Sequence, residues 1–537
     1  MRTRNFLVIS LAIAVSPSWL AAQSLQVNSA NPNAAPQGTI NLDVAIGGSG
    51  FKRGANSQWF VSGTTNPGGV TVNSTTFVNS NQLTANITVA DTATVASFDI
   101  TVRNSDGRTG KGTGLFSVLN KNNASNQGCI LQPLPPAFTL VNTLNYVNSS
   151  GAAQYTGAFG LTVRLRKVTL GGRDVLVTAV GSGVAQRLDV FFIDPLTATV
   201  LDGTAIGTNT QIQPHITKSI AIKPARTVIG DFNGDGVPDI AVGWSGNVAY
   251  FFLGSIDSLT GVLSYSDAIP ISPPTANGNF GMGLAAADLD GDGKDELVVS
   301  AGAVNAASTP NQVFLFKFNS LTSSFSAFQT LNDPAPRSKT GFGLSVALAD
   351  VTGTSSLDLI VGANSATYVY PGPSFTSSLV FPTGGGQVGA ANVDGGSFLD
   401  LVAANGGGAS IYSGLLFAGE PAAFTVTPIA GVPGIWLREL VLGDLNGDGL
   451  ADIVVGAPNN AGSSSCPGGG GSVYVYLTNP ATPDQPVRYM LEPPRIGVAY
   501  GEAVEVAPAY RLIFVGENHG DVGSVTGPGQ VWVYKVN

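Results

Sequence analysis

The chain has 537 residues, enough for several domains, and a net charge of −9 with only 11% charged residues. The acidic balance and the lack of a Lys/Arg cluster argue against nucleic-acid binding, which requires basic side chains to neutralise phosphates. The 69 glycines and 32 prolines, with short apolar runs between turn residues, predict an all-β protein.

The N-terminus has the form of a secretory signal. Arg2 and Arg4 precede an apolar run from Phe6 to Val15, and Trp19-Leu20-Ala21-Ala22 follows, with cleavage expected near Ala22. The run is too short to span a bilayer, so a signal peptide over residues 1–22 is favoured over a membrane anchor. We therefore expect an exported protein, secreted or at the cell surface, with no later membrane span.

Residues 25–119 contain short alternating runs such as TINLDVAI and QLTANITV, separated by turn signals, and predict a β-sandwich. The segments GGSGF (47–51) and FDITVRNSDG (98–107) resemble the immunoglobulin-like IPT/TIG domain. Residues 120–136 are polar and then proline-rich, and predict a linker. The two cysteines, Cys129 and Cys466, either form one disulfide or are two buried thiols; an exported location slightly favours the disulfide.

Three nine-residue loops share one pattern: DFNGDGVPD (231–239, loop 1), DLDGDGKDE (288–296, loop 2) and DLNGDGLAD (444–452, loop 5). Oxygen-bearing side chains at positions 1, 3, 5 and 9 suit Ca²⁺, which takes six to eight oxygen ligands, and glycines at positions 4 and 6 permit a tight turn. Position 12 is Val242, Val299 or Val455 within an apolar run, which excludes an EF-hand. The loops therefore lie between strands.

The loops belong to a longer repeat. Five motif starts recur at intervals of 42 to 62 residues, a period typical of solenoids and propellers. Each unit contains an aromatic–Gly pair such as Phe280-Gly281, an apolar strand, the loop, and further strands. Four strands per unit predict propeller blades over residues 137–537. The units are expected at 159–195, 226–272, 279–332, 340–382, 386–428, 437–492 and 499–537. A spare strand at 138–146 is expected to pair with the last unit.

The order of aromatic–Gly pair, acidic loop and GAP turn resembles the FG-GAP repeat of integrin α-subunit propellers and their bacterial relatives. The resemblance implies a seven-bladed β-propeller of four-stranded blades, preceded by the immunoglobulin-like sandwich, with about three strong calcium sites. Carried over by position, the implied metal ligands are Asp231, Asn233, Asp235, Asp239 and the carbonyl of Val237; Asp288, Asp290, Asp292, Glu296 and the carbonyl of Lys294; and Asp444, Asn446, Asp448, Asp452 and the carbonyl of Leu450.

Two further loops are incomplete. Loop 3 (350–358) keeps Asp350 and Asp358 but has Thr352 at position 3 and no acid at position 5. Loop 4 (392–400) begins with Asn392 and keeps Asp394 and Asp400. Because hydroxyl and amide ligands hold calcium more weakly than carboxylates, we expect these sites to be weak or empty.

The sequence favours an extracellular binding or adhesion module, with calcium as a structural ion and an extracellular protein or polysaccharide as partner. The alternatives are a polysaccharide-active lyase or hydrolase on the same scaffold, or a passive envelope scaffold. No catalytic motif is present, and the two histidines, His215 and His519, lie far apart in sequence. An enzyme would need convergent polar residues over the centre of the propeller. The basic candidates are Lys223, Arg226, Arg337, Lys339, Arg438 and Arg495.

Overall fold

The structure is a computed structural model. It describes residues 25–537 except 32, 38, 40–41, 91, 120–134, 136, 145–158, 184, 202–215, 245–246, 278, 303–309, 335–340, 383–384, 406–407, 415–422, 427–437, 459–470, 493–498 and 519–528. The predicted signal peptide, nearly all of the predicted linker and both cysteines lie outside these residues.

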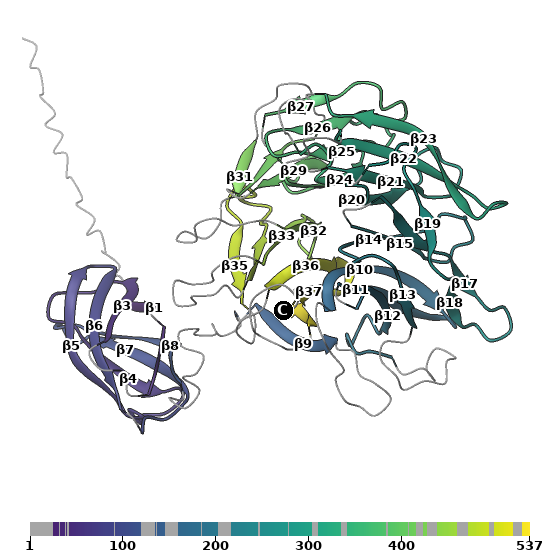
Figure 1. The fold of residues 1–537 in the computed structure, drawn as a ribbon. Helices are drawn as coiled ribbons and strands as arrows, with labels where there is room; N and C mark the ends of the chain where they lie inside the picture. The colour runs from purple at the N-terminus through teal and green to yellow at the C-terminus, as the bar shows by residue number, and fades with distance from the viewer. Residues whose placement is uncertain are drawn as a thin grey trace, which may run out of the picture. The chain divides into compact units, whose positions relative to one another are not determined.

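The chain divides into two compact units, Met1–Ile130 (unit 1) and Leu131–Asn537 (unit 2) (Figure 1). The regular secondary structure of the described residues consists of β-strands and a short 3-10 helix at Pro508–Tyr510. None of their helices is long and apolar enough to cross a membrane. The expectation of an all-β protein is confirmed.

Unit 1 contains two four-stranded sheets, antiparallel except where β2 runs parallel to β8. One sheet has the order β1 (Gln26–Asn31), β3 (Leu42–Ser49), β6 (Gln82–Val89) and β5 (Val70–Asn79). The other has the order β2 (Ala34–Pro36), β8 (Thr109–Leu119), β7 (Ser97–Arg103) and β4 (Asn56–Val61).

The two sheets of unit 1 share one apolar core. Every second residue of β6 is buried, as expected for a strand with one face against a core. Trp59 of β4 lies edge-on to Phe116 of β8, with ring centroids 4.6 Å apart. Trp59 is thus a core residue and is not available to line a ligand site.

The described part of unit 2 contains seven four-stranded antiparallel sheets, numbered here in chain order. Sheets 1 to 3 are β10 (Phe159–Leu170), β11 (Arg173–Ser182), β12 (Arg187–Ile193), β13 (Ile216–Ser219); β14 (Arg226–Gly230), β15 (Asp239–Gly243), β16 (Ala249–Phe252), β19 (Ile269–Ile271); and β20 (Gly283–Ala287), β21 (Glu296–Ala301), β22 (Gln312–Asn319), β23 (Ser324–Asn332). Sheets 4 and 5 are β24 (Ser345–Ala349), β25 (Asp358–Gly362), β26 (Thr367–Tyr370), β27 (Leu379–Phe381); and β28 (Gln387–Ala391), β29 (Asp400–Asn405), β30 (Gly408–Tyr412), β31 (Phe424–Val426). Sheets 6 and 7 are β32 (Glu439–Gly443), β33 (Asp452–Ala457), β34 (Ser472–Leu477), β35 (Val487–Leu491); and β36 (Ala499–Ala507), β37 (Leu512–Asn518), β38 (Gln530–Val536), β9 (Phe138–Leu144). A separate hairpin, β17 (Gly254–Ile256) and β18 (Leu263–Tyr265), is inserted in sheet 2.

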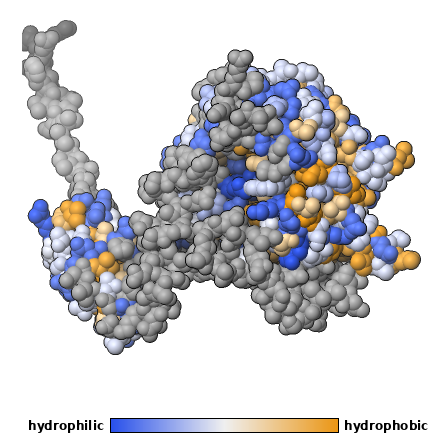
Figure 2. Space-filling view, viewed as in Figure 1, coloured by the Kyte–Doolittle hydropathy of each residue, from blue (hydrophilic) through white to orange (hydrophobic). Residues whose placement is uncertain are grey.

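Each sheet of unit 2 packs against the next one in the series. A buried apolar cluster lies between every consecutive pair of sheets, and another joins sheet 7 to sheet 1. The first strand of each sheet contacts the first strand of the following sheet, and β36 contacts β10 (Figure 1). Because the first strands contact one another in series, they lie innermost. On the face shown in Figure 2, apolar side chains of unit 2 gather to the right of its hydrophilic middle and at its right-hand edge.

The second strand of each sheet lies between neighbouring sheets, and this burial explains why its sequence is continuously apolar rather than alternating. All five residues of β15 and of β25 are buried, because each sheet is covered on both faces by its neighbours. A strand buried on both faces reads as an unbroken apolar run. This is the physical origin of repeated segments such as DIAVG and DLIVG.

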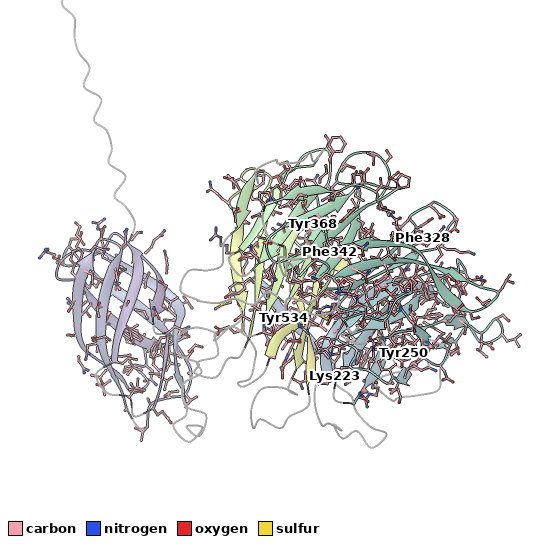
Figure 3. All side chains as sticks on the ribbon, turned by 45° about the horizontal axis from the view of Figure 1, so that its top comes forward. Lys223, Tyr250, Phe328, Phe342, Tyr368 and Tyr534 are labelled. Atoms are coloured by element: carbon pink, nitrogen blue, oxygen red, sulfur yellow. The ribbon has the colours of Figure 1, made fainter. Side chains whose placement is uncertain are left out.

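The aromatic–Gly pairs lie at the beginning of the sheets: Phe280-Gly281 and Phe342-Gly343 precede β20 and β24, whereas Phe159-Gly160 and Tyr500-Gly501 lie within the first residues of β10 and β36. Phe342 is fully buried, and its ring centroid lies 5.3 Å from that of Tyr368 (Figure 3). Gly281 has φ +98°, and a β-carbon there would lie 2.9 Å from the backbone nitrogen of Trp244. Glycine is needed here because another residue would be both strained and obstructed.

The predicted pairing of the spare strand is confirmed. β9 lies antiparallel to β38, with Phe138 opposite Val536 and Leu144 opposite Val531. Sheet 1 differs from the expected unit 159–195, because its fourth strand is β13, beyond that range. The sequence between β12 and β13 has only a weak apolar pattern, so β13 was not predicted as part of this unit.

Candidate metal centres

All five acidic loops occupy the same place in their sheets. Each joins the first strand to the second: loop 1 follows β14, loop 2 follows β20, and loop 5 follows β32. The incomplete loops 3 and 4 follow β24 and β28. The predicted location between strands is confirmed, and it places position 9 at the start of a buried second strand.

The position-1 carboxylate organises each complete loop. In loop 1, Gly234 donates its N–H to Asp231 Oδ1 and Gly236 donates to Oδ2, both at 2.8 Å. Corresponding bonds reach Asp288 at 2.7 and 2.9 Å, and Asp444 at 2.6 and 3.0 Å. Gly234 and Gly236 have φ of +76° and +79°, so the turn needs glycine at both positions.

The position-9 carboxylate ties the loop to the sheet. Asp239 is fully buried and accepts the N–H of Phe232 at 2.9 Å and that of Gly254 at 2.7 Å. Burial raises its pKa to about 7, and Asp235 and Asp231 add to the effect. Asp452 is equivalent: burial raises its pKa to about 6, with Asp448 contributing. A divalent cation beside these groups would favour their ionised form.

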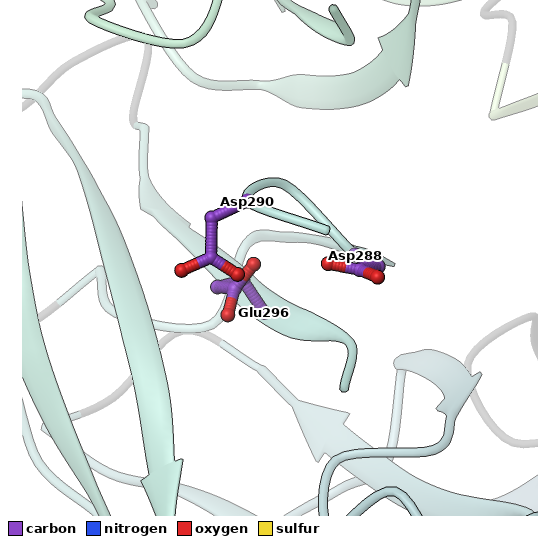
Figure 4. Close-up of side chains that lie close together, drawn as sticks. All are labelled: Asp288, Asp290 and Glu296. Carbon is purple, nitrogen blue, oxygen red and sulfur yellow. The ribbon is translucent and has the colours of Figure 1, made fainter. Parts of the chain in front are cut away.

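Loop 2 brings three carboxylates together. Oxygens of Asp288, Asp290 and Glu296 all lie within 4.8 Å of one another (Figure 4). The Lys317 ammonium contacts Asp290 Oδ2 and lies 3.7 Å from Glu296 Oε1. This contact lowers the pKa of Asp290, whereas burial raises that of Glu296.

The predicted side-chain ligands at positions 1, 3, 5 and 9 fit a calcium ion in their chemistry, because they are hard oxygen donors in one short turn. Among the described residues, three carboxylates come within 4.8 Å of one another in loop 2 but not in loops 1 and 5. The residues predicted to contribute carbonyls donate their N–H groups to position 5: Val237 to Asp235 at 2.8 Å, for example, and Leu450 to Asp448 at 2.9 Å. The loop backbone thus already orients the carboxylates.

In the incomplete loops, hydroxyl groups donate hydrogen bonds to the carboxylates. In loop 3, the Thr352 hydroxyl donates to the carboxylate of Asp358, 3.0 Å from Oδ2. In loop 4, Ser413 of the adjacent strand end donates to Asp394 Oδ2 at 2.6 Å. Internal hydrogen bonds therefore close these two loops, and the expectation that their metal sites are weak stays a prediction.

Loops 1 and 2 are joined by a residue that sequence reasoning did not single out. Asp295, at position 8 of loop 2, donates its N–H to the carbonyl of Asp231 at 2.8 Å, and its Oδ2 accepts the N–H of Asp231 at 2.7 Å. Arg166 of β10 donates to the same oxygen at 3.2 Å. The only sequence signal was an additional acid beside Glu296.

A second charged group, the inner-strand charge cluster, lies on the innermost strands. It comprises Arg164, Arg226, Arg438, Glu439, Glu502 and Glu505, from sheets 1, 2, 6 and 7. Arg164 pairs with Glu439 and lies 3.5 Å from Glu505, while Arg438 pairs with Glu502 at 2.8 Å. Only tertiary structure joins these residues, whose sequence positions span more than 300 residues.

Burial shifts the pKa values of two members of the inner-strand charge cluster. It lowers the pKa of Arg226 to about 10, with the charge of Arg438 acting in the same direction. Arg226 donates to the carbonyls of Met282 and Ala225, both at 3.0 Å. Burial raises the pKa of Glu505 to about 7 despite the opposing charge of Arg164. The half-buried indole ring of Trp244 lies 5.5 Å from the Arg438 guanidinium.

Of the basic candidates, Arg226 and Arg438 are brought together, whereas Lys223 is exposed. The other three, Arg337, Lys339 and Arg495, lie outside the described residues, as do His215 and His519. Sequence reasoning missed Arg164 and the three glutamates. A charged residue within an otherwise apolar inner strand was the available signal.

Comparison with known proteins identifies FG-GAP repeats in this chain. The FG-GAP repeat family matches residues 280–315 and 437–476, which contain loops 2 and 5. A curated relative, phosphatidylinositol-glycan-specific phospholipase D of Rattus norvegicus, is 46% identical over 79 residues. That match spans 13% of this chain and 9% of the relative's length.

Three solved structures share a low level of similarity. The Dos1 propeller is 12% identical with a TM-score of 0.40, and the match covers 96% of each chain. The exotype rhamnogalacturonan lyase YesX is 11% identical with a TM-score of 0.33, covering 95% of this chain and 90% of that one. The periplasmic gluconolactonase PpgL of Pseudomonas aeruginosa is 14% identical with a TM-score of 0.41, covering 66% and 97%.

Proposed function

We propose that this chain, a β-propeller carrying FG-GAP repeats, is an exported calcium-binding module that recognises an extracellular protein or polysaccharide. The observation that carries the proposal is the repeated loop geometry. Three loops present oxygen donors at the same four positions and orient position 1 with two backbone N–H groups. Calcium would be held by the ligand sets named above and would neutralise the crowded carboxylates of each turn.

The same proposal extends to the architecture. The seven sheets of unit 2 are the blades of a seven-bladed propeller, and β9 supplies the outer strand of the last blade. Unit 1 is an immunoglobulin-like module that acts as a spacer or interaction domain. Its two sheets around one core support this assignment.

Calcium has a structural rather than a catalytic role in this proposal. Each complete loop offers four side chains and a backbone carbonyl, which suits a closed site, whereas a catalytic metal needs an open coordination position. Export follows from the signal-like residues 1–22, and the extracellular calcium concentration would keep such sites filled. A Cys129–Cys466 disulfide also belongs to the proposal.

The test combines binding and chemistry in one experiment. The mature protein is incubated with polysaccharides and cell-envelope fractions, with calcium or with chelator, and both retention and released sugar are measured. Retention that depends on calcium, without release, supports a binding module. Absence of calcium binding by direct titration would overturn the proposal, as would a melting temperature indifferent to calcium and chelator.

A second candidate, a polysaccharide-active enzyme, is favoured by the inner-strand charge cluster. Arg226, Arg438 and Trp244 offer guanidinium groups and an aromatic face, which together suit a saccharide, and Glu505 has a pKa of about 7, suited to proton transfer. Sugar release abolished by Glu505→Gln, with an unchanged melting temperature, would establish this function in place of passive binding.

A further inference from the structure

Lys317 occupies an unusual position beside loop 2. It lies on β22, where Phe316 pairs with Leu297, so Lys317 stands opposite Glu296, the last residue of the loop. Its ammonium contacts Asp290 Oδ2 and is 3.7 Å from Glu296 Oε1. Both carboxylates belong to the ligand set of loop 2. A lysine from a neighbouring strand thus places its positive charge at the carboxylates that would bind calcium.

The equivalent positions in the other sheets show that this lysine is particular to loop 2. In sheet 2, Ile240 pairs with Phe252, so Leu253 stands opposite position 9 of loop 1. In sheet 6, Ile453 pairs with Tyr476, so Leu477 stands opposite position 9 of loop 5. Neither leucine can donate to a carboxylate. The other two complete loops therefore have no cation at this cross-strand position, although Lys294 lies beside Gly234 of loop 1 and Arg511 beside Gly447 of loop 5.

Loop 4 provides an independent parallel. Its residue at the same cross-strand position is Ser413, since Leu401 pairs with Tyr412. Ser413 donates to Asp394, the position-3 carboxylate, at 2.6 Å. Lys317 likewise contacts the position-3 carboxylate of loop 2. A side chain at the cross-strand position opposite loop position 9 can therefore contact the position-3 carboxylate and compete with a metal ion for it.

We propose that Lys317 is a tethered competitor for calcium in loop 2. It holds the carboxylates of the loop together when calcium is absent and must be displaced when the ion enters. The proposal rests on the calcium-binding function proposed above. According to this proposal, Lys317 weakens calcium binding by loop 2 relative to what its ligand set, the one with the most carboxylates, predicts. Lys317 also preserves the shape of the loop when the calcium concentration is low.

A place for the displaced ammonium is present nearby. Lys317 Nζ lies 5.6 Å from the centroid of the Phe328 ring, which is 47% exposed on the outer strand β23 (Figure 3). An aromatic face at that distance attracts a cation. The lysine can therefore leave the carboxylates while keeping one favourable contact and its access to water.

The size of the effect follows from the contact that calcium must break. Lys317 and Asp290 are both accessible to water, so the contact is weaker than a shielded ion pair. Removing Lys317 should tighten calcium binding at loop 2 about tenfold, which corresponds to about 1.4 kcal/mol.

The experiment isolates loop 2 by disabling loops 1 and 5 with Asp235→Asn and Asp448→Asn. In that background, calcium is titrated calorimetrically into chelator-treated protein carrying Lys317 or Lys317→Leu, which copies the residue of the other complete loops. Lys167→Leu is the matched control, because Lys167 pairs with the carboxylate of Asp174 at 2.7 Å in a comparably exposed ion pair outside the calcium loops. The reciprocal variant Leu253→Lys, in otherwise unmodified protein, tests transfer of the effect to loop 1.

We expect Lys317→Leu to lower the dissociation constant about tenfold and to lower the melting temperature in chelator, while Lys167→Leu changes neither by a comparable amount. Leu253→Lys should weaken the calcium site of loop 1. An unchanged dissociation constant in Lys317→Leu, or no binding at loop 2 with or without Lys317, overturns the inference. Failure of the unmodified protein to bind any calcium would instead refute the calcium-binding function itself.

Discussion

Asp235→Asn should separate the binding of calcium from the folding of loop 1. Asp235 is exposed, and its Oδ1 accepts the N–H of Val237 at 2.8 Å, a bond that an asparagine oxygen can also accept. Its Oδ2 accepts the side-chain amide of Asn233 at 2.9 Å; asparagine loses this exposed bond, which water can replace. The position-1 bonds to Asp231 do not involve this side chain's oxygens. In chelator, the free energy of unfolding should therefore change by less than about 0.5 kcal/mol.

In calcium, the same substitution should be costly. One site at a hundredfold excess of ligand over its dissociation constant stabilises the fold by about 2.7 kcal/mol. Asparagine at position 5 leaves loop 1 with two carboxylates and two amides, which weakens calcium binding. If the dissociation constant rises a hundredfold, the calcium-dependent stabilisation falls by about 2.3 kcal/mol.

The assay is urea unfolding followed by tryptophan fluorescence, with saturating calcium and with chelator. Asp257→Asn is the control, because Asp257 is an exposed aspartate in the turn of the β17–β18 hairpin and accepts backbone N–H groups from Leu259 and Thr260, outside the loop. Equal losses in calcium and in chelator for Asp235→Asn would refute the reasoning, as would an equal calcium-specific loss for Asp257→Asn.

Three other predictions follow from the described contacts. Asp239 and Asp452 have folded pKa values of about 7 and 6, above 3.8, so their contribution to apo stability is complete below about pH 4 and is lost as pH rises to 7. Calcium binds the ionised forms, so the calcium-dependent part of the free energy of unfolding should grow from pH 5 to 7.5; a flat profile would contradict this. Arg164→Met leaves Glu439 and Glu505 without their partner and should destabilise unit 2 by about 3 kcal/mol in urea unfolding, with partial recovery on adding Glu439→Gln. Finally, Thr352→Asp, Thr354→Asp and Ser355→Gly together should add one calcium ion to the titrated stoichiometry, because they restore the acidic pattern and relieve the φ of +65° at Ser355; an unchanged stoichiometry would show that loop 3 lacks more than its ligands.

The sequence by itself determined the class of fold and the position of each acidic loop. Glycines at loop positions 4 and 6, followed by a continuous apolar run, specify a tight turn leading into a buried strand. The structure has that turn at Gly234 and Gly236 and that strand at β15. These features are local, since backbone conformation and burial pattern are written in neighbouring residues. The pairing of the strand at 138–146 with the last unit joins distant parts of the chain. It was nevertheless predictable, because the strand has an apolar pattern and the last unit lacks a fourth strand.

Only the tertiary structure decided which charges meet. Lys317 is 21 residues beyond Glu296, and its place beside loop 2 depends on the cross-strand register of β21 and β22. Arg164 and Glu439 lie 275 residues apart and meet because sheets 1 and 6 bring their inner strands together. Asp295 links two loops through hydrogen bonds that no repeat pattern encodes. Coulombic and hydrogen-bond contacts act over a few ångströms in space, so their partners are fixed by how the sheets pack rather than by spacing along the chain.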